Sequence, residues 1–170
     1  MESPFKADIL KGKVAVVTGG GSGIGLEIST QFGRHGAAVA IMGRRRQVLD
    51  AAVAALRSEG IRVSPLSPKD STFHSTVVSE LLFGLRNEKL MFSSAAVDSI
   101  TRSLALEWGT DYDIRVNGIA PGPIADTPGM RKLAPGEMQS KSREYRPLYK
   151  LGERWDIAMA ALYLASDAGL

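Results

Sequence analysis

The chain has 170 residues, of which 44% are apolar and 23% charged. This balance is typical of one folded globular domain with a single core, and it argues against a disordered chain. Because the chain has no cysteine and only two histidines, we expect no disulfide, no catalytic thiol and no metal site. No apolar run approaches the ~20 residues of a membrane helix, so no membrane span is expected. The N-terminus, MESPFKADILKGK, has no apolar signal core.

The formal net charge of +3 comes from the first third of the chain. Residues 1–60 hold eight Lys/Arg and five Asp/Glu, whereas charges balance in the remainder. A basic excess can indicate nucleic-acid binding, but no stripe of alternating basic and aromatic residues accompanies it. We therefore expect a local anion site and no nucleic-acid partner.

The first 64 residues predict alternating strands and helices. The expected elements, in order, are a strand at Lys13–Thr18, a helix at Gly23–His35, a strand at Ala38–Met42, a helix at Gln47–Glu59 and a strand at Ile61–Ser64. Short valine-rich runs suit buried parallel strands, and Gly36 and Gly60 suit helix ends. This order predicts the α/β fold class, a Rossmann-like doubly wound parallel sheet.

The pattern is less regular after Pro65. Pro65 and Pro68 interrupt the chain, and residues 65–93 predict no clear strand. Three further elements are expected: an amphipathic helix at Ala95–Trp108 ended by Gly109, a strand at Ile114–Ala120 and a helix at Asp156–Ala165. The sequence thus predicts a single domain over residues 1–170 with an incomplete sheet of about four strands.

A glycine-rich loop joins the first strand to the first helix. Glycines let the backbone turn tightly and approach a pyrophosphate, and the helix N-terminus offers free N–H groups and the positive end of its dipole. Its place within a β-α-β unit predicts a dinucleotide site rather than a plain tight turn. The expected cofactor-binding residues are Gly19, Gly20, Gly21, Ser22, Gly23, Ile24 and Gly25.

Arginines follow the second strand, where an NAD site places an acidic residue for the ribose hydroxyls. Here the sequence reads Gly43-Arg44-Arg45-Arg46, with no acid until Asp50. Guanidinium groups favour a 2′-phosphate, and three solvated arginines are the alternative interpretation. Since cations are disfavoured at a helix start, we favour NADP(H) as the cofactor.

Three segments resemble the short-chain dehydrogenase/reductase family: TGGGSGIG at Thr18–Gly25, AAVDSITRSLALEWG at Ala95–Gly109, and IRVNGIAPGPI at Ile114–Ile124 with Thr127. Within the family, the sequence is most similar to the branch of plant peroxisomal 2,4-dienoyl-CoA reductases. The resemblance implies an NADP-dependent oxidoreductase that reduces an unsaturated fatty acyl-CoA substrate in peroxisomal fatty acid β-oxidation.

The resemblance also assigns roles to residues. It implies that Arg44 and Arg45 meet the 2′-phosphate and that Asp70 meets the adenine. It places the loop beside the nicotinamide on Pro121, Gly122, Pro123, Ile124 and Thr127. It allows a homo-oligomer or pairing with a full-length sibling, because Ala95–Trp108 matches the family's subunit-contact helix.

The chain departs from the family between the third strand and Ala95, where the family carries further strands and its catalytic residues. The Tyr-x-x-x-Lys motif would fall on Leu90–Ser94, where neither residue type occurs. Serine has no positive charge to bind ribose hydroxyls or to lower a neighbouring pKa. We therefore assign no catalytic residue and expect impaired chemistry.

The last residues, Ala168-Gly169-Leu170, differ from the Ser-Lys-Leu type address of the peroxisomal branch. The expected compartment is the peroxisome, or the cytoplasm if that address is really missing.

Two other functions stay open at this point. The chain is alternatively a non-catalytic fragment for nucleotide binding or subunit pairing, or another short-chain reductase acting on a 3-oxoacyl thioester or a steroid. For the sheet, we predict that Ile114–Ala120 pairs in parallel with Val14–Thr18, since the N–H and C=O groups of that apolar edge need partners.

Overall fold

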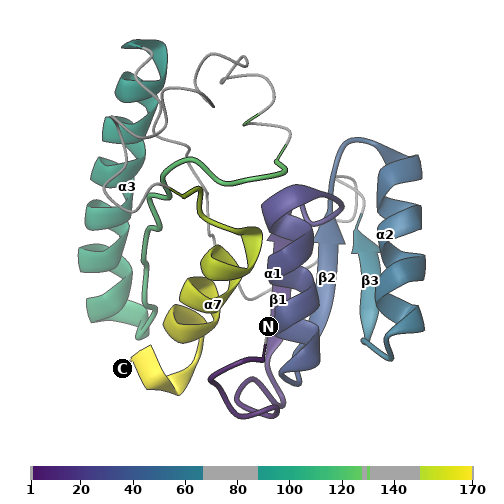
Figure 1. The fold of residues 1–170 in the computed structure, drawn as a ribbon. Helices are drawn as coiled ribbons and strands as arrows, with labels where there is room; N and C mark the ends of the chain where they lie inside the picture. The colour runs from purple at the N-terminus through teal and green to yellow at the C-terminus, as the bar shows by residue number, and fades with distance from the viewer. Residues whose placement is uncertain (1, 67–87, 128–129, 131–149, 170) are drawn as a thin grey trace. The chain divides into compact units, whose positions relative to one another are not determined.

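The computed structural model describes residues 2–66, 88–127, 130 and 150–169 (Figure 1). The chain divides into two compact units. The first unit comprises Met1–Val78 with Trp155–Leu170, and the second unit comprises Ser79–Arg154. Two compact units in one chain are not by themselves two domains, so the single domain stays a prediction. Within the described residues, no helix is long and apolar enough to cross a membrane.

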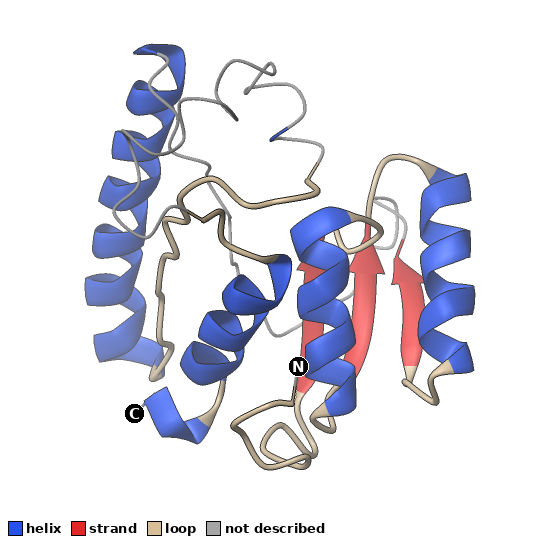
Figure 2. Ribbon diagram, viewed as in Figure 1, coloured by secondary structure: helices blue, strands red, loops and turns tan. Residues whose placement is uncertain are grey.

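The first unit contains a parallel sheet of three strands in the order β1-β2-β3 (Figure 2). The strands are β1 at Val14–Thr18, β2 at Ala38–Met42 and β3 at Val63–Leu66. Val14 lies opposite Ala38, and Val39 lies opposite Val63. The carboxyl ends of the parallel strands therefore meet at one edge of the sheet, where the connecting loops begin.

Two helices make the crossovers between the strands. Helix α1 spans Gly23–Arg34 and helix α2 spans Arg46–Ser58. Right-handed crossovers that progress in one direction place both helices on the same face of the sheet. The alternation of burial agrees: the core consists of Ala15, Val17, Val39, Ile41 and Val63 from the sheet, packed with Ile24, Ile28 and Phe32 of α1 and Leu49, Val53 and Leu56 of α2.

A buried histidine joins the N-terminal segment to the end of α1. The ring of His35 is 3% exposed, and its Nδ1 lies 2.6 Å from the carbonyl oxygen of Gln31. Because that oxygen only accepts, Nδ1 donates to it, and Nε2 lies 2.7 Å from the hydroxyl oxygen of Ser3. The N–H of Leu10 donates to the His35 carbonyl at 2.9 Å. The helix end and residues 3–10 are thus held together without an unpaired buried nitrogen.

Helix α7 spans Arg154–Ala165, and its residues from Trp155 onward belong to the first unit. Ala158 and Leu162 are fully buried. A short 3-10 turn at Asp167–Gly169 follows, and the Asp167 carboxylate accepts from the Lys13 ammonium at 2.8 Å. The end of the described chain is therefore joined to the start of β1.

The second unit contains α3, which spans Glu88–Tyr112. Asp113 follows with a left-handed φ of 54°, and the N–H of Ile114 donates to the Trp108 carbonyl at 3.2 Å. This is the hydrogen-bond pattern of a helix C-terminal cap. An isolated parallel bridge joins Ile124 to Gly152 further along the chain.

The predicted fold class is confirmed, because the first unit is an α/β structure with a parallel, incomplete sheet. Both crossover helices lie within about one residue of the predicted bounds. The third strand is displaced: it starts at Val63, and Pro65 lies inside it. Proline is tolerated there because β3 is an edge strand, where one missing N–H breaks no ladder bond.

Two predictions for the second unit were wrong. The helix predicted at Ala95–Trp108 begins at Glu88, inside the segment predicted to be irregular, and continues through Gly109 to Tyr112. It passes Gly109 because Asp113 rather than the glycine adopts the left-handed cap. The strand predicted at Ile114–Ala120 is absent, since residues 113–123 belong to no strand and β1 pairs only with β2 within the described structure. Residues 114–120 are largely exposed, with Ile114 at 37%, so this β-prone sequence has no burial to favour a strand.

The packing of α1 on the chain before β3 yields a stability prediction. A Cβ added to Gly33 would lie 2.2 Å from Cγ2 of Ile61, a buried side chain. We expect Gly33→Ala to lower the free energy of unfolding by about 1–3 kcal/mol, as overpacking does, measured by urea denaturation. Gly122→Ala is the control, because nothing lies within 4 Å of its added Cβ. Equal stability of the two variants would contradict this packing.

Candidate functional site

The glycine-rich loop starts at the carboxyl end of β1. Gly19 adopts a left-handed φ of 68°, and its N–H donates to the Met42 carbonyl of β2 at 2.7 Å. The N–H of Ser22 donates to the Gly19 carbonyl at 3.4 Å. The loop thus reverses direction within four residues while it stays bonded to the neighbouring strand.

Two glycines of the loop leave no room for a side chain. A Cβ on Gly25 would lie 2.6 Å from the backbone oxygen of Gly19, and one on Gly20 would lie 2.7 Å from Cγ2 of Ile41. The first turn of α1 therefore lies directly against the end of β1. A backbone surface without side chains is what a pyrophosphate needs for close approach.

The N-terminus of α1 has no side-chain cap. Ser22 occupies the N-cap with extended backbone, its side chain makes no capping hydrogen bond, and the first turn holds no acidic residue. The first N–H groups of a helix have no intrahelical partner and carry the positive end of the helix dipole. This end of α1 can therefore bind an anion with backbone N–H groups alone.

The three arginines lie just after β2, at the same edge of the sheet as the loop. The Arg46 guanidinium donates to the Asp50 carboxylate at 3.0 Å, one turn along α2. Arg44 and Arg45 are exposed. Arg46 is thus partly neutralised within its own helix, whereas Arg44 and Arg45 remain as cations near the glycine-rich loop.

Helix α2 connects the arginines to the glycine-rich loop. A Cβ on Gly21 would contact Val48 and Leu49 at 3.3 Å, and one on Gly43 would contact Leu49 at the same distance. The start of α2 therefore packs against both loops of this edge. Neither Val48 nor Leu49 was assigned to the site from the sequence. That α2 supports the glycine-rich loop follows from the tertiary packing.

The Pro121–Thr127 segment lies in the second unit and is held by its own hydrogen bonds. The Ala125 N–H donates to the Gly152 carbonyl at 2.8 Å, and the Gly152 N–H donates to the Pro123 carbonyl at 3.1 Å. The hydroxyl of Thr127, 2% exposed, donates to the Ile124 carbonyl at 3.0 Å and accepts from the Met130 N–H at 3.1 Å. This hydroxyl is therefore buried and bonded within its own segment.

For the remaining predicted positions, the structure gives no contact that bears on the site. Asp70 lies outside the described residues. Leu90 and Ser94, where the resemblance places a tyrosine and a lysine, both lie in α3. The structure therefore brings Gly19–Gly25, Arg44 and Arg45 together at one sheet edge of the first unit, and it places Pro121–Thr127 in the other unit. The roles of these residues stay predictions.

Comparisons with known proteins agree with this reading of the fold. The short chain dehydrogenase profile matches residues 13–82, and the profile of Enoyl-(Acyl carrier protein) reductase matches residues 71–169. A peroxisomal 2,4-dienoyl-CoA reductase of Arabidopsis thaliana is 43% identical over 248 residues, covering 99% of this chain and 83% of the relative. The mouse protein of that name is 32% identical, covering 95% and 80%.

Solved structures share the fold at lower identity. A hydroxysteroid dehydrogenase from Escherichia coli superposes with a TM-score of 0.75 at 24% identity, covering 96% of this chain and 94% of that one. L-sorbose reductase from Gluconobacter frateurii, solved with NADPH and L-sorbose, gives a TM-score of 0.73 at 22% identity, covering 94% and 92%. At these identities the likeness supports the Rossmann-like fold alone.

The chain belongs to the short-chain dehydrogenase family, an oxidoreductase family that uses nicotinamide cofactors. It is shortened inside the matched region. The alignment with the Arabidopsis relative spans 248 residues and the whole chain has 170, so at least 78 positions of the relative have no counterpart here.

The contact between Gly25 and Gly19 leads to a test of the site. We expect Gly25→Ala to weaken NADPH binding by roughly 10- to 100-fold, because a clash of about 1–3 kcal/mol displaces the backbone of the loop. Gly109→Ala is the matched control, since its added Cβ would meet only the Ile114 carbonyl oxygen at 3.8 Å, an ordinary contact outside the candidate site. Calorimetric titration of both variants measures the effect. Unchanged binding by Gly25→Ala would show that the loop does not hold the cofactor.

Proposed function

We propose that this chain is an NADP(H)-binding reductase of the 2,4-dienoyl-CoA type, whose turnover on its own is strongly reduced. The observation that carries the proposal is the 43% identity over 99% of the chain to a plant 2,4-dienoyl-CoA reductase. Its substrate class is then an unsaturated fatty acyl-CoA, and its compartment the peroxisome, as the names of these relatives indicate.

The proposed binding of NADP(H) depends on the loops at the carboxyl ends of β1 and β2. The bare backbone at Gly19–Gly25 suits a pyrophosphate, and the uncapped start of α1 supplies N–H donors for it. Arg44 and Arg45 stand where an acidic residue would select NAD. Their guanidinium groups suit the additional phosphate of NADP(H), so the residues present fit that cofactor.

This assignment predicts a preference for NADPH over NADH. We expect Arg44→Ala to weaken NADPH binding by roughly 10- to 150-fold, the equivalent of about 1.5–3 kcal/mol for a charge-assisted hydrogen bond. Binding of NADH should stay nearly unchanged, because it has no 2′-phosphate. Titrations of both nucleotides against the same protein give the comparison.

Arg46→Ala is the matched control, because its guanidinium already bonds Asp50. It removes the same charge two residues away and should affect NADPH binding less than Arg44→Ala does. Equal affinity of the unmodified chain for NADPH and NADH would overturn the assignment. So would an Arg44→Ala variant that binds NADPH normally.

Reduction of a dienoyl-CoA requires a hydride and a proton at the substrate. NADPH supplies the hydride when bound. The chain's own contribution would be to orient the cofactor through the glycine-rich loop and the arginines, and to deliver the proton. At Leu90 and Ser94 it offers neither a phenol nor an ammonium for that second task, and at least 78 positions of the relative are missing.

The consequence is a measurable loss of turnover. General acid catalysis contributes about 10²- to 10⁴-fold, and we expect no measurable oxidation of NADPH with a 2,4-dienoyl-CoA by the purified chain alone. The Arabidopsis relative, assayed in parallel, is the positive control. Oxidation at a rate comparable to that control would refute the proposed impairment.

The absence of at least 78 positions of the relative favours one alternative function, nucleotide binding without catalysis. A non-catalytic nucleotide-binding chain would retain NADPH binding while a panel of dienoyl-CoA, 3-oxoacyl thioester and steroid substrates gives no turnover. Turnover of only one of the latter two would instead indicate another short-chain reductase.

A further inference from the structure

One leucine side chain packs against both loops that carry the predicted cofactor residues. A Cβ added to Gly21 would lie 3.3 Å from Cδ2 of Leu49, and a Cβ added to Gly43 would lie 3.3 Å from the same methyl group. The Leu49 side chain is buried, with 4% of the residue exposed. A single methyl group therefore lies next to the glycine-rich loop and next to the arginine loop, Gly43–Arg45.

The backbone of Leu49 also holds the arginine loop. Its N–H donates to the Arg45 carbonyl at 3.1 Å, at the start of α2. Arg44 thus lies between two residues that Leu49 contacts, Gly43 through its side chain and Arg45 through its backbone. Because the Arg44 side chain is exposed, its position depends on how firmly these two neighbours fix its backbone.

The two loops are joined at their bases by the backbone and further out by Leu49. The Gly19 N–H donates to the Met42 carbonyl at 2.7 Å, where both loops begin. Beyond that bond, the three atoms nearest to a Cβ added at Gly43 all belong to Leu49. Packing on Leu49 therefore determines how far the arginine loop lies from Gly21.

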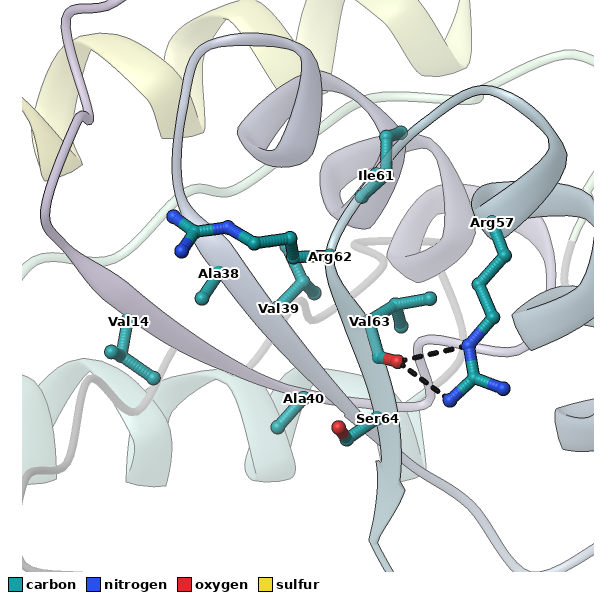
Figure 3. Close-up of a pocket in the computed structure, with 9 residues that line it drawn as sticks. All are labelled: Val14, Ala38, Val39, Ala40, Arg57, Ile61, Arg62, Val63 and Ser64. Atoms are coloured by element: carbon teal, nitrogen blue, oxygen red, sulfur yellow. Dashed lines mark hydrogen bonds between the residues drawn. The ribbon is translucent and has the colours of Figure 1, made fainter.

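The opposite end of α2 is held by separate contacts. The Arg57 guanidinium donates to the Val63 carbonyl of β3 at 3.1 and 3.3 Å (Figure 3). Leu56, about two turns beyond Leu49 on the same helix, is 1% exposed. Truncation of Leu49 should therefore loosen the end of α2 at the site, whereas truncation of Leu56 removes the same atoms from the core near the other end.

We propose that Leu49 is a positioning residue that couples the glycine-rich loop to the arginine loop and thereby sets the preference for NADPH over NADH. The inference rests on the proposed function, in which the glycine-rich loop holds the pyrophosphate and Arg44 meets the 2′-phosphate. Both phosphates belong to one nucleotide, so they are bound together only when the loops keep a fixed separation. NADH has no 2′-phosphate, and its binding depends less on that separation.

The test compares the ratio of NADPH affinity to NADH affinity between variants. We expect Leu49→Ala to lower this ratio roughly 2- to 30-fold, the size of effect that a mutation has on coupling between sites. Calorimetric titration of both nucleotides against the same protein measures it. The ratio separates positioning from stability, because a lower folded fraction weakens the apparent binding of both nucleotides by the same factor.

Two variants serve as controls. Leu56→Ala also leaves a cavity in the core and lowers stability, but it should keep the ratio of the unmodified chain. Leu49→Met preserves the side-chain volume and should retain that ratio too. Circular dichroism verifies that each variant is folded. If Leu49→Ala does not fold, Leu49→Val takes its place, because it also removes the δ-methyl groups while leaving a smaller cavity.

A substitution on the arginine loop gives an independent readout. Gly43→Ala places a methyl group 3.3 Å from Cδ2 of Leu49, so it should also lower the ratio. In a chain that carries Leu49→Ala as well, that contact no longer exists. We therefore expect the double variant to lower the ratio by less than the product of the two single effects, as residues in contact do.

The proposal is overturned if the folded Leu49 variant keeps the ratio of the unmodified chain, or if Leu56→Ala lowers the ratio as much. Either result leaves the proposed function standing. A failure of the proposed function is recognised before any substitution, because the unmodified chain then binds NADPH and NADH equally or binds neither. That result would overturn the positioning role as well.

Discussion

The close approach of two backbone segments is the constraint on which the candidate site depends. Gly25 lies so near the carbonyl oxygen of Gly19 that a methyl group there would come within 2.6 Å of it. This contact fixes the first turn of α1 on the end of β1, and it directs the free N–H groups of the helix toward the carboxyl edge of the sheet. The arginines after β2 reach the same edge because the strands are parallel and in register from Val14 to Thr18.

The first unit is well supported around this contact. The faces of α1 and α2 bury a continuous apolar core against one side of the sheet. His35, Ser3 and Leu10 hold the N-terminal segment to the end of α1, while Lys13 and Asp167 join the start of β1 to the end of the described chain. Doubly wound sheets bind dinucleotides on such a unit. Loss of the 78 or more positions that the relative has and this chain lacks can therefore remove catalytic residues while the nucleotide-binding unit is kept.

Elements that depend on neighbouring residues in the sequence were predicted correctly, whereas strand pairing that depends on distant residues was not. The glycine-rich loop, α1 and α2 depend on local signals: turn glycines, a valine run and apolar residues at helical spacing. These were correct to about one residue. Pro65 was misread as a breaker, because only the sheet order shows that it lies on an edge strand. Ile114–Ala120 has a strand-like sequence but no strand beside it, and pairing of that kind depends on distant residues that a local pattern does not contain.

The most direct test of the account is a crystal structure of the chain with NADP⁺. We expect pyrophosphate density at the start of α1, against Gly19–Gly25, and the 2′-phosphate within hydrogen-bond distance of Arg44 or Arg45. A nucleotide bound elsewhere, or a 2′-phosphate that contacts neither arginine, would contradict it.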